Sequence, residues 1–315
     1  MDNSPSGHGG TPDLQWQNVA LALSFVAFNA ALSYGLQLGV GSSLITAAAR
    51  CVIQLTLVSY VLERIFNTNH PAAVAGIALL LNILAAFEIV ANKCKMRYPK
   101  MFFVVLASMA LSTIPISIIG IRFAMSVNPF WKPEQYIPIV GMLCGSTISN
   151  LVVSLSFVLQ ELNENRDKTE TYLAFGASRF EACKPIAKSA LRLALTPTIN
   201  QMSVLGIISI PGMMTGAILG GSSVVQAARL QMIIMFMLSA SSALATIISI
   251  VCTLAICVDG QHRVRAERID CRPFVLWRGL AILGRALKSA ASSACFGGRG
   301  KPAKGTEREP LLGSP

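Results

Sequence analysis

Long apolar stretches, separated by short polar or charged segments, form the dominant pattern of this chain. A helix needs about 20 consecutive apolar residues to cross the hydrocarbon core of a bilayer. Seven stretches approach or reach that length, and the last of them contains no charged residue. The predicted spans are Val19–Leu38, Leu44–Ile65, Ala72–Ala91, Met101–Ile119, Ile137–Leu159, Leu191–Ile210 and Met232–Val258. The pattern predicts an all-α, polytopic membrane helix bundle of about seven spans.

The positions of Lys and Arg give these spans an orientation. Most of the 26 cationic residues fall between spans three and four, between spans five and six, or after Val258, and the segment before the first span has none. Cytoplasmic loops are enriched in Lys and Arg. We therefore expect the N-terminus outside and the C-terminus in the cytoplasm. Residues 1–16 form a short tail, 17–259 the membrane domain, and 260–315 a basic tail with an amphipathic stretch and a disordered end.

The composition agrees with the membrane class. Only 13% of the residues are charged, against roughly 25% in a soluble domain. The net charge of +11 follows the predicted cytoplasmic loops and tail, so it indicates orientation and no nucleic-acid partner. The eight cysteines show neither zinc-ligand spacing nor a disulfide framework.

The longest loop between spans, residues 160–190, has the pattern of two helices joined by a tight turn. Gly176 can supply the left-handed residue that ends a helix, and Ser178 with Glu181 has capping-box spacing. Exposed aromatic side chains surrounded by charge are typical of a protein contact, although a helix packed under its own bundle is also consistent with this pattern. The residues assigned to the contact are Glu170, Tyr172, Leu173, Phe175, Gly176, Ser178 and Arg179.

Three segments of the chain resemble one known family. They are Ala48–Leu55, Ile137–Met142 and the run from Glu170 to Gly221, which contains the Pro-Gly-Met-Met block beginning at Pro211. The chain is similar to the bacterial iron-export permease and its plant aluminium-tolerance relatives. The resemblance implies a seven-span permease subunit of an ABC transporter, active as a homodimer in metal-ion export or tolerance. It also implies that the loop at 160–190 docks a separate ATPase chain.

The sequence itself contains no phosphate-binding loop. The run Gly297–Lys301 lacks both the spacing and the final hydroxyl residue of that motif. We therefore expect no cofactor and no enzymatic activity in this chain, with ATP and Mg²⁺ bound by the partner ATPase. A seven-helix receptor and an ATP-independent channel or carrier are the alternatives.

Several polar residues fall inside predicted spans, where they are costly unless paired or facing water. Glu88 is either a ligand of a cation pathway or an interfacial residue paired with Lys93 or Lys95. Arg50 and Gln54, one turn apart, are predicted to have a structural role.

Span six is interrupted by polar residues and by Pro197, so this helix could open and expose carbonyl groups, as helices of transporters do at ion sites. The remaining candidates for the substrate pathway are Asn150, Asn200, Gln201, Met213 and Met214. Interhelical hydrogen bonds and simple packing are the alternative roles. Which residues, if any, bind a metal stays open.

Gly212, Gly216 and Gly220 repeat every four residues, a spacing that allows close approach of two helices. We therefore predict a tight packing element at the outer end of span six.

Near the end of the chain, Glu307 with Leu311 and Leu312 resembles an acidic dileucine sorting signal. The pattern favours a vacuolar or other endomembrane location, with the plasma membrane as the alternative.

Overall fold

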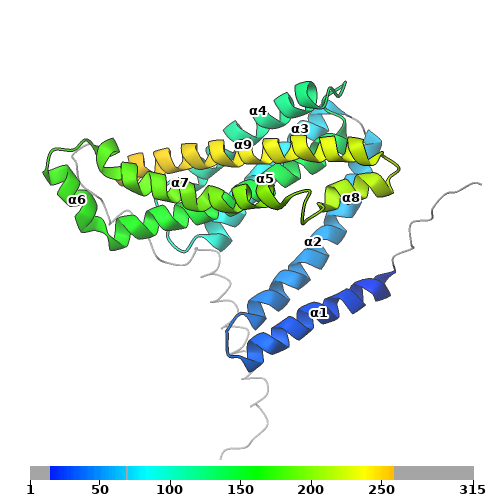
Figure 1. The fold of residues 1–315 in the computed structure, drawn as a ribbon, viewed down its shortest axis with the longest axis horizontal. Helices are drawn as coiled ribbons and strands as arrows, with labels where there is room; N and C mark the ends of the chain where they lie inside the picture. The colour runs from blue at the N-terminus through cyan, green and yellow to red at the C-terminus, as the bar shows by residue number, and fades with distance from the viewer. Residues whose placement is uncertain (1–14, 69, 259–315) are drawn as a thin grey trace, which may run out of the picture. The chain divides into compact units, whose positions relative to one another are not determined.

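The computed structural model describes residues 15–68 and 70–258. Within these residues the chain is helical, with no named strand. Figure 1 shows the order of the helices. Their bounds are α1 Trp16–Gly35, α2 Gly41–Thr68, α3 Pro71–Glu88, α4 Met101–Ile119, α5 Pro133–Glu164, α6 Arg166–Ala174, α7 Arg179–Val204, α8 Gly212–Leu219 and α9 Val224–Cys257. Short π-helical turns, Ile89–Lys93 and Gly120–Ala124, continue α3 and α4. The predicted amphipathic stretch and the sorting residues Glu307, Leu311 and Leu312 lie outside the described residues.

Six of these helices are long and apolar enough to cross a membrane: α1, α2, α3 with its π turn, α4 with its π turn, α5 and α9. The membrane-bundle prediction is therefore confirmed, and the predicted number of about seven is close. The sixth predicted span, Leu191–Ile210, is wrong in its bounds. Its helix, α7, starts at Arg179 and ends at Val204, and it carries four cationic residues that lower its mean hydropathy.

Helix α7 nevertheless runs the length of the bundle beside α5 and α9 (Figure 1). Its first turns line a cavity together with the last turns of α5, and farther along Asn150 of α5 bonds Thr198 of α7. The two helices are therefore antiparallel neighbours. With 26 residues α7 is about 39 Å long, enough to cross the hydrocarbon core. The packing of α7 against α5 and α9, and not its hydropathy, therefore indicates that α7 crosses the membrane.

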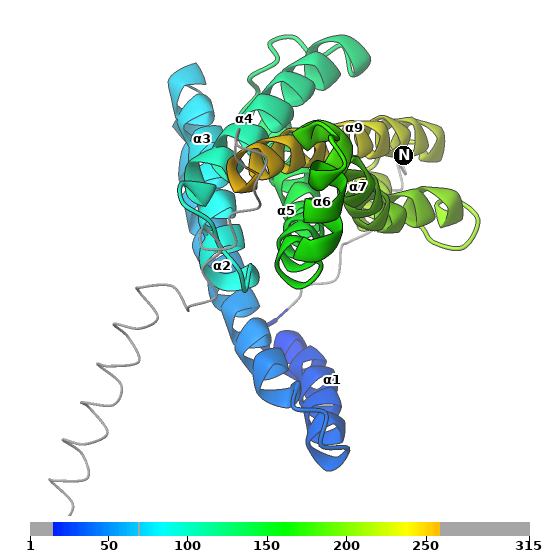
Figure 2. The same ribbon diagram turned by 90° about the vertical axis from the view of Figure 1, so that its left-hand side faces the viewer.

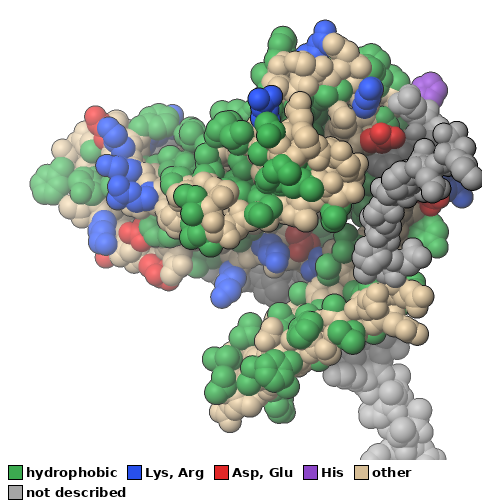
Figure 3. Space-filling model, turned by 45° about the vertical axis from the view of Figure 1, so that its right-hand side comes forward, with side chains coloured by type: hydrophobic (Ala, Val, Ile, Leu, Met, Phe, Trp, Pro, Cys, Tyr) green, Lys and Arg blue, Asp and Glu red, His purple; other side chains and the backbone are tan. Residues whose placement is uncertain are grey.

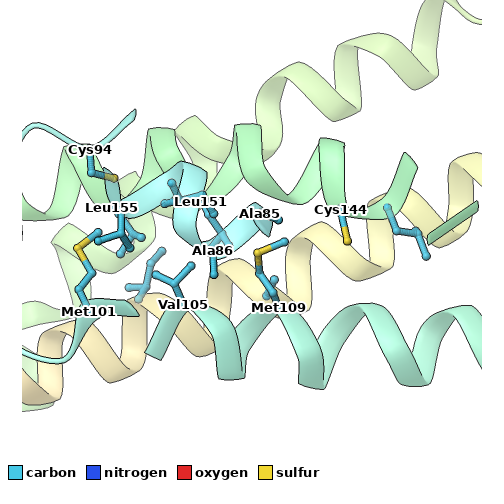
Figure 4. Close-up of a cluster of buried hydrophobic side chains, with 14 of the residues drawn as sticks. Ala85, Ala86, Cys94, Met101, Val105, Met109, Cys144, Leu151 and Leu155 are labelled. Atoms are coloured by element: carbon cyan, nitrogen blue, oxygen red, sulfur yellow. The ribbon is translucent and has the colours of Figure 1, made fainter. Parts of the chain in front are cut away.

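The core lies among α3, α4, α5, α7 and α9. Figure 2, a view along the bundle, shows these helices grouped together. Figure 4 shows its centre, where Ala85 and Ala86 of α3, Met109 of α4 and Leu151 and Leu155 of α5 meet. The small alanines let the helices approach closely, and the larger side chains fill the remaining space.

Hydroxyl side chains accompany these apolar residues in the interior. The fully buried ones on α4 and α9 include Ser108, Ser112, Ser117, Ser241, Ser242, Thr246, Ser249 and Thr253. Most of them bond a carbonyl of their own helix, as Ser112 Oγ does to Met109 O at 3.0 Å. Direct bonds between elements are fewer, such as Thr113 Oγ1 to Asn82 Oδ1 at 2.8 Å. The core is thus held mainly by close packing.

Helix α1 packs against α2. Many of their large apolar side chains are exposed in the chain, including Phe25, Phe28, Leu55 and Leu57. In a chain that spans a membrane, such surfaces can contact lipid or the helices of another subunit.

Gly120 gives a test of core packing. A Cβ atom built there would clash with the Sδ and Cε atoms of Met237, whose side chain is buried. Because these atoms form the flexible end of that side chain, Gly120→Ala should destabilise the protein by about 1 kcal/mol, the low end of the range for overpacked cores. Gly76→Ala on α3 is the matched control, because no atom lies within 4 Å of its added Cβ. Thermal unfolding in detergent measures both. Equal melting temperatures would contradict this packing.

Candidate coupling and transport sites

The α6–α7 elbow (residues 166–181) forms as its sequence predicts. Helix α6 ends before Gly176, which has a φ of +89°, and the amides of Gly176 and Ala177 bond the carbonyls of Leu173 and Tyr172, each at 3.1 Å. A side chain at Gly176 would meet no neighbour, so the backbone conformation alone favours glycine there. The predicted helix stop is confirmed.

A complete capping box begins α7, as predicted. The backbone amide of Ser178 donates to Glu181 Oε2 at 2.9 Å, and the amide of Glu181 donates to Ser178 Oγ at 3.4 Å. The Ser178 hydroxyl also donates to the same carboxylate oxygen at 2.7 Å. These bonds to the charged form lower the pKa of Glu181. Its contribution to elbow stability is therefore present at neutral pH and is lost as the pH falls through that lowered pKa.

The elbow presents aromatic side chains outward. Phe175 is 88% exposed and Tyr172 54%, and Phe180 on the first turn of α7 is also exposed. In contrast, Leu173 and Thr169 are buried, so one face of α6 packs on the bundle and the other is free for a partner. Both interpretations of this helix, as a protein contact and as a helix packed under its own bundle, therefore describe part of it.

Charged groups surround these aromatics. Arg166 Nε bonds Glu170 Oε1 at 2.5 Å, and the guanidinium of Arg179 lies 5.0 Å from the centre of the Phe180 ring. Figure 3 shows cationic and acidic side chains gathered at the end of the bundle where α6 lies, next to a wide face with few charges. An open cavity of about 390 Å³ lies beside the elbow, between the first turns of α7 and the last turns of α9.

Glu88 has a different partner from the one expected. It pairs with Arg50 Nη2 at 3.0 Å, joining α2 to α3, and it also accepts a hydrogen bond from Asn92. The predicted pairing of Glu88 with Lys93 or Lys95 is wrong, because the guanidinium of Arg50 on α2 reaches the Glu88 carboxylate instead. Gln54 lines a shallow cavity of about 380 Å³ together with Arg50 and Glu88. A structural link between helices accounts for Arg50 and Glu88 together.

The structure does not bring the six pathway candidates into one cluster. Asn150 Nδ2 bonds Thr198 Oγ1 at 3.2 Å between α5 and α7. Asn200 and Gln201 lie exposed on α7, Met213 and Met214 lie on α8, and Glu88 ends α3. The prediction that Pro197 opens the helix is wrong, since α7 continues to Val204. Thr196 Oγ1 bonds Arg192 O at 2.6 Å in the turn before the proline.

Helix α7 carries a stripe of polar residues along one face, and these residues were not grouped together in the prediction from the sequence. Its members are exposed and recur at spacings of three or four residues, which places them on one helix face. They are Ser189, Arg192, Thr196, Asn200 and Ser203. The spacing of these polar residues is visible in the sequence. However, the predicted start of span six at Leu191 lies within the stripe, so the prediction placed Ser189 in a loop and the other members in a span. A polar face of a helix that crosses the membrane requires water or a protein partner.

Gly212 and Gly216 lie on α8, a separate short helix, and Gly220 directly follows it, so the glycine repeat is not on span six. Within the described chain nothing lies within 4 Å of a Cβ added at Gly212 or Gly216, and one at Gly220 would meet only carbonyl groups of α8. The predicted close helix approach is therefore absent inside this part of the chain. Among the described residues, no three His, Cys, Asp or Glu side chains gather as a metal site.

The six helices of membrane-crossing length and apolar character define the class of this chain as a multi-pass membrane protein. Residues 16–257 match the model of an uncharacterised protein family, UPF0014. The chain belongs to this family.

Relatives of the chain include proteins named as a membrane protein and as a permease. The UPF0014 membrane protein slr1647 of Synechocystis is 30% identical over 75% of this chain and 90% of its own length. The probable iron export permease protein FetB of Escherichia coli is 27% identical over 79% and 94%. The protein ALUMINUM SENSITIVE 3 of Arabidopsis thaliana is 29% identical over 73% and 82%. No solved structure matches the chain.

Proposed function

We propose that the chain is the membrane-spanning subunit of a two-component ATP-driven exporter whose ATPase is a separate protein. The observation that carries this proposal is the α6–α7 elbow: a rigidly capped turn with an aromatic side chain 88% exposed at its tip, at the end of two long helices. Exposed aromatic anchors surrounded by charge are the typical centres of protein contacts.

The elbow is placed to transmit force. Helices α5 and α7 leave its two sides and run antiparallel through the bundle, and the polar stripe lies along α7. A partner that moves the elbow therefore tilts the helix that carries the polar face. Such a movement shifts the population between two states of the bundle only if the partner contacts each state differently, as an ATPase does in its ATP-bound and free forms.

A homodimer completes this arrangement. The polar face of α7 is exposed within the described chain, and a second copy would enclose it as a water-filled pathway between two stripes. The names of the bacterial and plant relatives support a metal ion or metal complex as the cargo. An endomembrane location remains the prediction from the C-terminal sequence.

Co-purification tests the proposal. The full-length protein, expressed in its own cells with an affinity tag, should retain an ABC ATPase, and vesicles containing both should accumulate metal only with ATP. A chain that transports metal at the same rate without any ATPase would instead be a carrier. Recovery of a G protein in place of the ATPase would support the receptor alternative.

A further inference from the structure

A cavity of about 450 Å³ lies at the end of the bundle away from the elbow, between the end of α7, α8 and the first turns of α9. Four methionines contribute to its wall: Met202 of α7, Met214 of α8, and Met232 and Met235 of α9. They come from three separate helices, so the fold, and not a short sequence motif, brings the four methionines to the wall of one cavity.

One buried polar group in the same wall has no partner. Gln231 is 6% exposed, and its Oε1 atom accepts no hydrogen bond in the described structure. The remaining buried side-chain atoms without a partner in the described residues are hydroxyl oxygens, those of Ser33, Thr147, Ser241 and Ser249. A hydroxyl group can turn to donate to a nearby carbonyl, whereas an amide oxygen can only accept. Gln231 Oε1 is fully enclosed and lacks a donor, and a turn of the side-chain amide toward the cavity that Gln231 lines would let a cation offset this loss.

We propose that this cavity binds a soft monovalent cation, Cu(I) or its analogue Ag(I), through the thioethers of Met202, Met214 and Met235 and through Oε1 of Gln231. Thioether sulfur is a soft ligand that selects Cu(I) over hard cations. The residues that line the wall include no carboxylate, which Mg²⁺ and Ca²⁺ require, and all its ligands are neutral. A single positive charge is the least costly to place among them.

Simple packing and a bound lipid tail each account for only part of this cavity. Methionine has three rotatable bonds and normally fills gaps, yet here four methionines surround an open space. A lipid tail or another apolar molecule would fill that space but would leave the Gln231 oxygen without a partner. A cation satisfies both the sulfurs and the oxygen. This site does not depend on the elbow or on an ATPase, so it can be tested separately from the proposed function.

The test uses the purified full-length protein in a chloride-free buffer with silver nitrate. The pocket variant M202L/M214L/M235L is compared with a control, M96L/M109L/M125L, which changes three methionines that do not line the cavity. Leucine keeps the volume and apolarity of methionine but removes the sulfur. Both variants keep all eight cysteines, which also bind silver, so only the difference between them counts.

Equilibrium dialysis with elemental analysis should find about one silver ion fewer on the pocket variant than on the wild type or the control. Silver should also raise the melting temperature of the wild type and control more than that of the pocket variant, because a ligand of the folded state stabilises it. Equal silver binding by the pocket variant and the control would overturn the proposal and assign the silver to thiols. If the pocket variant does not fold, Met214→Leu on α8, a single change, gives the same comparison.

A second variant separates a ligand role of Gln231 from a structural one. Gln231→Leu removes a buried amide oxygen without a partner, so the metal-free protein should melt at the same or a higher temperature. Its silver affinity should fall by at least roughly 10-fold, because loss of a group that only supports a ligand already costs about 10–100-fold at metal sites. An unchanged silver affinity would remove Gln231 from the site.

Discussion

Phe175→Asp should abolish the association with the proposed ATPase and the proposed ATP-driven transport while leaving the bundle folded. Phe175 is 88% exposed at the tip of the elbow, so the chain itself loses no packing when it is replaced. Loss of a central aromatic anchor costs at least about 2 kcal/mol of binding, roughly 30-fold in affinity, and a buried unpaired carboxylate adds to that loss. Co-purification and ATP-dependent uptake into vesicles measure the two effects.

Phe123→Asp is the matched control. Phe123 is 75% exposed in the π turn that follows α4, away from the elbow. The same chemical change there should leave the ATPase bound. If Phe175→Asp retained the ATPase as well as Phe123→Asp does, the elbow would not be the docking surface.

Arg50→Leu should loosen the attachment of α2 to α3. It removes the cation 3.0 Å from Glu88 and leaves that carboxylate to its hydrogen bond with Asn92. Breaking a fully buried ion pair costs about 3–5 kcal/mol, but half of the Arg50 side chain is exposed, so we expect about 1–2 kcal/mol. Thermal unfolding in lipid nanodiscs measures the loss.

The exchanged pair Arg50→Glu with Glu88→Arg should recover most of this stability, because the two charges again attract. Arg229→Leu, a change at an exposed arginine of α9, is the control for loss of a cation and should have little effect. A double variant no more stable than Arg50→Leu would show that the pair does not hold α2.

Local patterns in the sequence predicted much of this fold. Gly176 and the Ser178–Glu181 pair specified the elbow because helix stops and caps depend on a few neighbouring residues. The apolar runs specified six of the spans in the same way. Helix α7 was misplaced, since its crossing depends on packing against α5 and α9 and its own hydropathy is low.

Such local patterns could not predict contacts between residues that are distant in the sequence. Lys93 and Lys95 are near Glu88 in sequence, but Arg50 reaches it from another helix, 38 positions earlier. Met214 was a candidate for the substrate pathway from the sequence, but only the fold places it beside methionines of α7 and α9 along one cavity. Spacing along one element is readable from the sequence, whereas the neighbour across an interface is set by the packing.

The hydroxyl groups in the interior bear on how such a bundle can change shape. Ser108, Ser112 and Thr246 each bond a carbonyl of the helix that carries them. If α9 slides past α4, these bonds move with their own helices and none has to break. Small side chains also interlock less deeply than long ones, so the surfaces can shear past each other with few rotamer changes. The centre of the protein is thus closely packed but joined by few hydrogen bonds between elements, such as Thr253 Oγ1 to the Tyr98 hydroxyl at 3.0 Å, which favours such a movement.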